Sequence, residues 1–252
     1  MSKAIPLNHP GVSYRFQRVY PGIQTGHFLT VQTKRQESTR FFMQQSSDLD
    51  GACGLHIAAM LLGAYGLAKI SALREMSNRK SGFSALVWQA FQHTYFAGVH
   101  PEEWVEIMDG LNLPLALTAK YGIQDNADGH ALEWLMRGGD LVALAFASVR
   151  HTRTKHWALA VGVEGAVVDK AHTPDTILLL DPSASEPSFA PSNARLRLPT
   201  TGPGSRRAPP DLLKPPKDSK RRPVHWIYEA AEWNAEEVRL LAAVRLQRRA
   251  AA

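Results

Sequence analysis

The only cysteine of the 252-residue chain lies in a sequence context that suits a nucleophile. Cys53 follows a polar stretch that ends in Asp-Gly-Ala, and the residues after it have the apolar composition of a buried helix. A thiol in the first turn of a helix lies near unpaired backbone N–H groups and the positive end of the helix dipole. Both favour the thiolate, which is the reactive form of cysteine. The sequence therefore predicts that Cys53 is a nucleophile.

Two polar residues further along the chain are placed where they could assist such a thiol. His156 opens an apolar strand after a polar run, and Asp181 ends another apolar run just before Pro182. A histidine can hold a proton and later donate it, and a carboxylate can fix the tautomer of that histidine. We therefore expect a triad of Cys53, His156 and Asp181. The weaker candidates for the last two roles are His151, Asp169 and Asp175.

A glutamine ahead of the cysteine could complete the site. The amide N–H of Gln44 or Gln45 could donate to the oxyanion that forms on an attacked carbonyl, beside the backbone N–H of Cys53. We favour Gln45 and leave Gln44 open. His56 lies one helical turn from Cys53, and we interpret it as a packing residue.

The order of glutamine, cysteine, histidine and aspartate resembles that of the papain-like cysteine peptidases. The closest resemblance is to the bacterial branch that contains the double-glycine leader peptidases and their stand-alone relatives. The matching pieces are Gln45, the Cys53-Gly54 step into an apolar helix, the His156-Trp157 strand and Asp181-Pro182. The resemblance implies a helical subdomain that carries the cysteine, packed on an antiparallel sheet that carries the histidine and the aspartate.

Periodicity along the chain also favours an α+β fold, with helices first and strands second. We expect one catalytic domain formed by residues 1–182 and 224–252, with residues 183–223 as a mobile, Pro-rich basic loop or excursion. Asn234 to Glu237 form a capping-box pattern that indicates a C-terminal helix. The expected helices cover residues 53–65, 84–91 with Ser84 as N-cap, 101–110 and 129–137. The expected strands cover residues 113–117, 141–147, 156–163, 176–180 and 224–228.

Composition limits the classes of partner and compartment. Most of the net charge of +6 comes from residues 206–222, which contain seven basic and two acidic side chains. We interpret this segment as a solvated linker or a contact for an acidic partner, and nucleic acid as an unlikely partner because the charge is not spread over a folded face. No apolar run is long enough to cross a bilayer. A single cysteine and the absence of a signal sequence favour a cytoplasmic protein, or an effector secreted without a cleavable signal.

The predicted function is hydrolysis of a peptide or another amide by a thiol protease that needs no cofactor and no metal. One alternative keeps the triad but uses an amine as acceptor, as in transglutaminases and arylamine acetyltransferases. Another is a papain-like domain that binds peptides without catalysis. The expected substrate is a protein or a peptide, and no membrane is involved.

Overall fold

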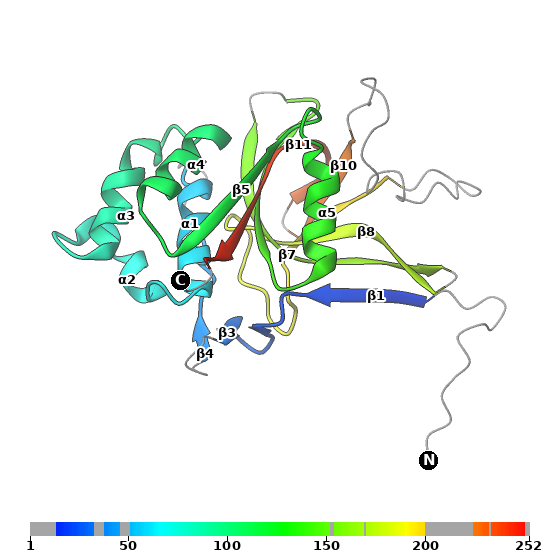
Figure 1. Cartoon of the computed structure of the whole chain (residues 1–252), viewed down its shortest axis with the longest axis horizontal. Helices are drawn as coiled ribbons and strands as arrows, with labels where there is room; N and C mark the ends of the chain where they lie inside the picture. Colours follow the sequence, from blue (N-terminus) through cyan, green and yellow to red (C-terminus); the bar gives the residue numbers. More distant parts are fainter. Residues whose placement is uncertain are drawn as a thin grey trace, which may run out of the picture.

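The computed structural model describes residues 14–32, 38–45, 51–151, 154–168, 170–199, 224–231 and 233–249. These residues form an α+β structure in which most helices gather on one side and a large antiparallel sheet lies on the other (Figure 1). The helices are α1 (Cys53–Ala64), α2 (Ile70–Arg74), α3 (Phe83–Phe91), α4 (Pro101–Gly110) and α5 (Ala127–Arg137), with short 3₁₀ turns η1 (Met76–Asn78) and η2 (Gln92–Thr94). Within the described part of the chain, no helix is long and apolar enough to span a membrane.

The large sheet has eight strands, and a subset of them closes into a barrel. Its strands are β1 (Tyr14–Val19), β5 (Leu115–Tyr121), β6 (Leu141–Ser148), β7 (Lys155–Val168), β8 (Ala171–Leu180), β9 (Ala194–Arg197), β10 (Trp226–Ala230) and β11 (Trp233–Arg248). Antiparallel pairing runs from β6 through β7, β8, β9, β10 and β11 and returns to β6. β1 extends β7, and β5 extends β11. A small second sheet contains β2 (Ile23–Gln24), β3 (Thr30–Gln32) and β4 (Ser38–Arg40).

Both faces of the barrel wall are covered, which explains why every residue of β6 is buried. Because side chains alternate along a strand, Val142, Leu144 and Phe146 face the barrel interior, where α5 packs. Leu141, Ala143 and Ala145 face outward against α1. A strand that is buried on both sides is apolar throughout, as this one is.

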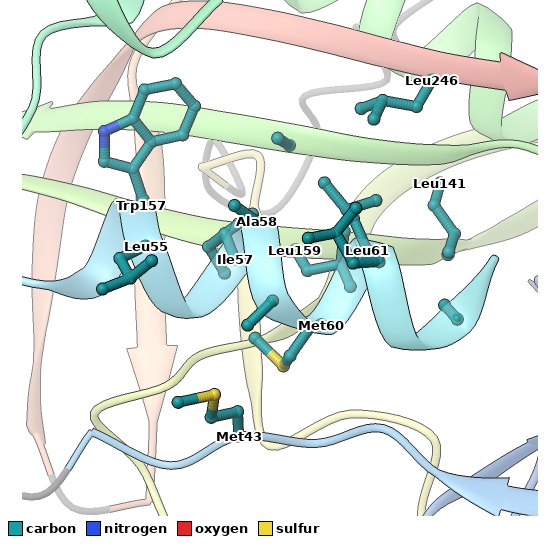
Figure 2. Close-up of a cluster of buried hydrophobic side chains, with 14 of the residues drawn as sticks. Met43, Leu55, Ile57, Ala58, Met60, Leu61, Leu141, Trp157, Leu159 and Leu246 are labelled. Atoms are coloured by element: carbon teal, nitrogen blue, oxygen red, sulfur yellow. The ribbon is translucent and has the colours of Figure 1, made fainter. Parts of the chain in front are cut away.

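Helix α1 is the centre of the core between the helices and the sheet. All of its residues are buried, in keeping with a sequence that is apolar on every side. Figure 2 shows α1 between Leu141, Leu159 and Leu246 of the sheet on one side and Met43 on the other. Gly66 follows the helix with a φ of 65°, a left-handed conformation that suits glycine. The helix that carries Cys53 is therefore held on several sides.

Most of the expected elements are present with small shifts in their ends. The prediction for residues 101–110 matches α4, and the expected strand at 113–117 extends to Tyr121 as β5. Ser84 was expected to cap α3, but it lies inside that helix, whose N-cap is Gly82.

The expected C-terminal helix is wrong. Residues 233–248 form the strand β11, which pairs with β10, β6 and β5. Val238, Leu240 and Ala243 face the barrel interior, and Ala242, Val244 and Leu246 face α1. A bulge near Leu241 shifts the alternation by one residue. Three sheet partners outweigh the local capping-box pattern, which depends on only two hydrogen bonds.

The first part of the predicted excursion belongs to the sheet. Residues 183–199 are described, and β9 inserts between β8 and β10 with Ala194 and Leu196 buried. Residues 206–222, the basic segment, lie outside the described residues.

Gly54 offers a test of how tightly the start of α1 is packed. A Cβ on this residue would lie 2.3 Å from Val99 Cγ1 and within 3.4 Å of two indole rings. Gly54→Ala is therefore expected to lower the free energy of unfolding by about 1–3 kcal/mol, measured by urea unfolding. Gly110→Ala is the matched control, because a Cβ there meets no atom within 4 Å. An equal effect of the two substitutions would contradict this account.

Candidate active site

Cys53 is the first residue of α1 and lies at the edge of the core. Its side chain is 8% exposed, and its Sγ lies 3.9 Å from the carbonyl oxygen of Gly51. The N-cap residue is Ala52, which has no side-chain oxygen to occupy the helix N-terminus. The first N–H groups of a helix have no acceptor within it, so the Cys53 N–H points out of the helix end beside the thiol.

His156 is the second residue of β7 and approaches Cys53 from the sheet. Along this strand Trp157 and Leu159 face α1, whereas Ala158 and Ala160 face the barrel interior. By this alternation His156 lies on the interior side, at the mouth of the barrel. Its side chain is 21% exposed, and its ring meets that of Phe146 edge to face at 5.5 Å.

Two stacked tryptophans hold the start of α1 against β7. The rings of Trp104 and Trp157 lie 5.0 Å apart at 28°. The indole N–H of Trp104 donates to the carbonyl of Gly54 at 2.9 Å, and that of Trp157 donates to the carbonyl of Val99 at 3.1 Å. Gly54 follows Cys53 and Trp157 follows His156, so this pair fixes the separation of the two candidate catalytic residues.

Asp181 follows β8 and is fully buried, yet both of its carboxylate oxygens have partners. Oδ1 lies 2.8 Å from His156 Nε2 and accepts from the backbone N–H of Ser183 at 2.8 Å and from its hydroxyl at 2.6 Å. Oδ2 accepts from the hydroxyl of Tyr228 at 2.5 Å. The backbone of Asp181 is held by the side-chain amide of Asn193 through bonds of 2.7 and 2.9 Å. Such a carboxylate is buried at low cost because its hydrogen-bonding capacity is used.

The imidazole of His156 lies between the carboxylate and the thiol. Nε2 is used by Asp181 and lies 3.2 Å from the Ser183 hydroxyl. The Cys53 side chain lies close enough to the same ring to raise the pKa of His156, and Asp181 occupies Nε2. The structure therefore brings Cys53, His156 and Asp181 together as one chain of contacts.

The electrostatics of this chain favour charge on both His156 and Asp181. Burial opposes the charged form of His156, but the charge and hydrogen bond of Asp181, with a smaller effect of Cys53, raise its pKa well above 6.5. Burial also opposes ionisation of Asp181, but His156, Ser183 and Tyr228 together lower its pKa to about 2. An imidazolium beside the sulfur is the partner that a thiolate needs.

The backbone of Gln45 is tied to the same region. Its N–H donates to the carbonyl of Pro182 at 2.7 Å, so the segment before Cys53 runs beside the end of β8. The side chain of Gln45 is half-buried, and that of Gln44 is exposed. The role of either glutamine as oxyanion donor stays a prediction.

The weaker candidates are used elsewhere or are not described. Asp175 forms an ion pair with Arg15 at 2.7 Å, and His151 is exposed in the connection between β6 and β7. Asp169 lies outside the described residues. His56 is buried, with Nδ1 2.8 Å from the carbonyl of Ala52, in keeping with a packing residue.

Three residues of the site were missed by sequence reasoning, namely Ser183, Asn193 and Tyr228. Ser183 carried a usable signal, because a serine two residues after an aspartate often bonds to that side chain in a turn. Asn193 reaches Asp181 from the residue before β9, and Tyr228 reaches it from β10, which only the pairing of those strands reveals.

Among the described residues, no group of three or more His, Cys, Asp or Glu side chains is arranged to hold a metal ion. No model of a known protein family matches the chain, and no curated protein matches its sequence. A functional proposal therefore rests on the arrangement of Cys53, His156 and Asp181.

The charge coupling in the site predicts how His156 titrates. Asp181→Asn removes the carboxylate that raises the pKa of His156 and leaves the burial that lowers it, so the pKa is expected to fall. NMR titration of labelled histidine measures this change. Tyr228→Phe keeps the carboxylate and is expected to keep most of the elevation. An imidazole that titrates identically in the wild-type protein and Asp181→Asn would show that the two residues are not coupled.

The same coupling predicts a pH window of stability. The raised pKa of His156 stabilises the fold below pH 6.5, and this contribution is lost as the pH rises through the raised value. The lowered pKa of Asp181 stabilises it above pH 3.8, and this is lost as the pH falls toward 2. The difference in unfolding free energy between the wild-type protein and Asp181→Asn is therefore expected to be largest between those limits. Urea unfolding at pH 3, 5.5 and 8 measures it, and a difference that is constant with pH would contradict the coupling.

Proposed function

We propose that this protein is a papain-like cysteine peptidase or a related amide hydrolase. The single observation that carries the proposal is the position of the His156 imidazole, between the thiol of Cys53 and the buried carboxylate of Asp181. A nucleophile, a base and a group that orients the base are the three parts of a catalytic triad. The helix that carries Cys53, the strand β7 that carries His156 and the antiparallel strand β8 that Asp181 directly follows support the papain-like assignment.

In the proposed resting state the imidazole of His156 carries a proton, because Asp181 raises its pKa. The start of α1 adds the positive end of a helix dipole near the sulfur. An imidazolium and a helix N-terminus are the two surroundings that favour a thiolate.

The reaction then proceeds in two stages. The Cys53 thiolate attacks the carbonyl carbon, and His156 donates its proton to the departing amine, which leaves a thioester on the sulfur. Water then attacks the thioester and gives a proton back to His156, so that the acid leaves and the thiolate returns. The Cys53 N–H, at the N-terminal end of α1, stabilises the oxyanion in both stages, with Gln45 as the proposed second donor.

Asp181 acts through His156 in this scheme. Its bond to Nε2 holds the tautomer and the ring orientation that present Nδ1 to the sulfur. Ser183 and Tyr228 hold the carboxylate in turn, and Asn193 holds its backbone. These three residues are positioning residues, and each is expected to affect the rate less than Asp181 does.

The reactivity of Cys53 tests the proposal directly. We expect iodoacetamide to alkylate Cys53 at pH 6 at least ten times faster than it alkylates free cysteine, because the imidazolium favours the thiolate. His156→Gln should remove most of this advantage. Intact-mass spectrometry measures both rates, and Cys53→Ala provides the blank.

A panel of peptides with electrophilic ends then tests for turnover at the same residue. The wild-type protein is expected to form a covalent adduct at Cys53 with at least one member of the panel, and Cys53→Ala with none. Hydrolysis of a matching amide substrate should be lost in Cys53→Ala while its urea unfolding stays close to that of the wild-type protein. A thiol no more reactive than free cysteine, together with full activity in Cys53→Ala, would overturn the assignment.

A further inference from the structure

The mouth of the barrel contains a cavity of about 140 Å³ that adjoins His156. Its walls come from four strands and from the chain after β8. The apolar part of the wall is Phe146, Tyr228 and Val238, and Ser183 and His156 connect it to the candidate catalytic site. The volume is enough for several water molecules, and so for one extended side chain.

A carboxylate at this mouth is not explained by the fold. Glu236 pairs with Tyr228 across β10 and β11 and lies on the same face as Val238, which points into the barrel. An interior-facing position two residues from Val238 favours an apolar side chain. Glu236 is nevertheless half-buried and lines the cavity. The next residue, Glu237, lies on the other face and bonds to His225 at 2.7 Å.

The carboxylate of Glu236 has a hydrogen-bond donor but no cation among the described residues. It accepts from the hydroxyl of Ser148, which is buried beside it. No ion pair within 4.0 Å joins Glu236 to a described basic side chain. Lys155 lines the same cavity, but its ammonium lies 3.3 Å from Nδ1 of His100. A cation that entered the cavity would therefore meet a half-buried negative charge.

The position of the cavity relates it to the part of the substrate that leaves with the amine. In the proposed function His156 gives its proton to the departing amine, so the nitrogen of the leaving group must lie next to this imidazole. Cys53, which keeps the acyl part, is not in the wall of the cavity. The group attached to the departing nitrogen is the part of the substrate that the cavity can accept.

We propose that the barrel mouth is a leaving-group subsite that selects a cationic side chain, arginine or lysine, through Glu236. The inference rests on the proposed function. The alkyl part of the side chain packs on Phe146, Tyr228 and Val238, and its charged end pairs with the carboxylate. Glu236 is thus a specificity-determining residue, and the preferred substrate carries arginine or lysine directly after the bond that is cleaved.

Acyl transfer to amines tests this subsite without a known substrate. The Cys53 thiolate attacks p-nitrophenyl acetate, and His156 gives its proton to the departing p-nitrophenol, which ionises to p-nitrophenolate in solution. This leaves a thioester on Cys53 beside a neutral imidazole. An added amine then attacks the thioester: the C–N bond forms, the C–S bond breaks, and the amine proton passes to His156. Argininamide and citrullinamide are offered at equal concentration, because they have nearly the same shape and differ in charge. Mass spectrometry measures the two N-acetyl amides.

The expected result is a product ratio of at least ten in favour of argininamide in the wild-type protein. Glu236→Gln is expected to bring the ratio close to one. Because both amides are measured in the same sample, a change in acylation cancels from the ratio. Glu237→Gln is the matched control and should keep the wild-type ratio, since its side chain lies on the opposite face of β11.

The outcomes separate the subsite from the proposed function. A burst of p-nitrophenolate with a ratio near one in the wild-type protein would overturn the subsite and leave the hydrolase intact. The absence of a burst would overturn the proposed function. Calorimetric titration with the two amides then decides the subsite independently. Tighter binding of argininamide that is lost in Glu236→Gln supports it, and equal binding of both amides overturns it.

Discussion

The stacked pair of Trp104 and Trp157 is the constraint on which the site depends. A catalytic contact between a helix and a sheet does not tolerate a shift of about an ångström between them. The two indole N–H bonds, to Gly54 and Val99, oppose such a shift at the point where α1 meets β7. The absence of a side chain on Gly54 allows the rings to lie this close. The burial of apolar side chains holds α1 on the sheet, and the Trp104–Trp157 pair fixes the position of α1 along β7.

The closed barrel provides the second constraint, because it gathers residues that are distant in sequence. Asn193 reaches Asp181 from the residue before β9, and Tyr228 reaches it from β10. Strand pairing places β9 beside β8 and β10 beside β9. Closure also leaves a mouth, and His156 lies on its rim with the carboxylate of Asp181 behind it. The same topology therefore positions His156, the proposed base, and forms the cavity next to it. Ligand sites are common in the mouths of barrels for this reason.

The sequence predicted the residues whose local context is distinctive and missed those that depend on pairing. Cys53, His156 and Asp181 each lie at the end of an apolar segment, and such ends are visible in one dimension. Tyr228 and Glu236 lie in the middle of strand patterns, and their importance follows only from their neighbours across the sheet. The helix expected after Asn234 failed for the same reason, because three partner strands decide the conformation of β11. Local signals thus identify turns and the ends of apolar segments. Long-range strand pairing decides which residues within the strands reach the site.

The charges of the site and of the cavity are balanced in different ways, and this difference fits the two proposed roles of catalysis and substrate selection. Asp181 is buried with its partner His156 and with three hydrogen-bond donors, so its charge is satisfied within the protein and is expected to persist through every step. Glu236 has one hydroxyl donor among the described residues and opens into a cavity. A carboxylate that is satisfied in advance orients a base, whereas one that is incompletely satisfied gains most from an incoming cation. The two carboxylates at one barrel mouth are therefore suited to two different tasks.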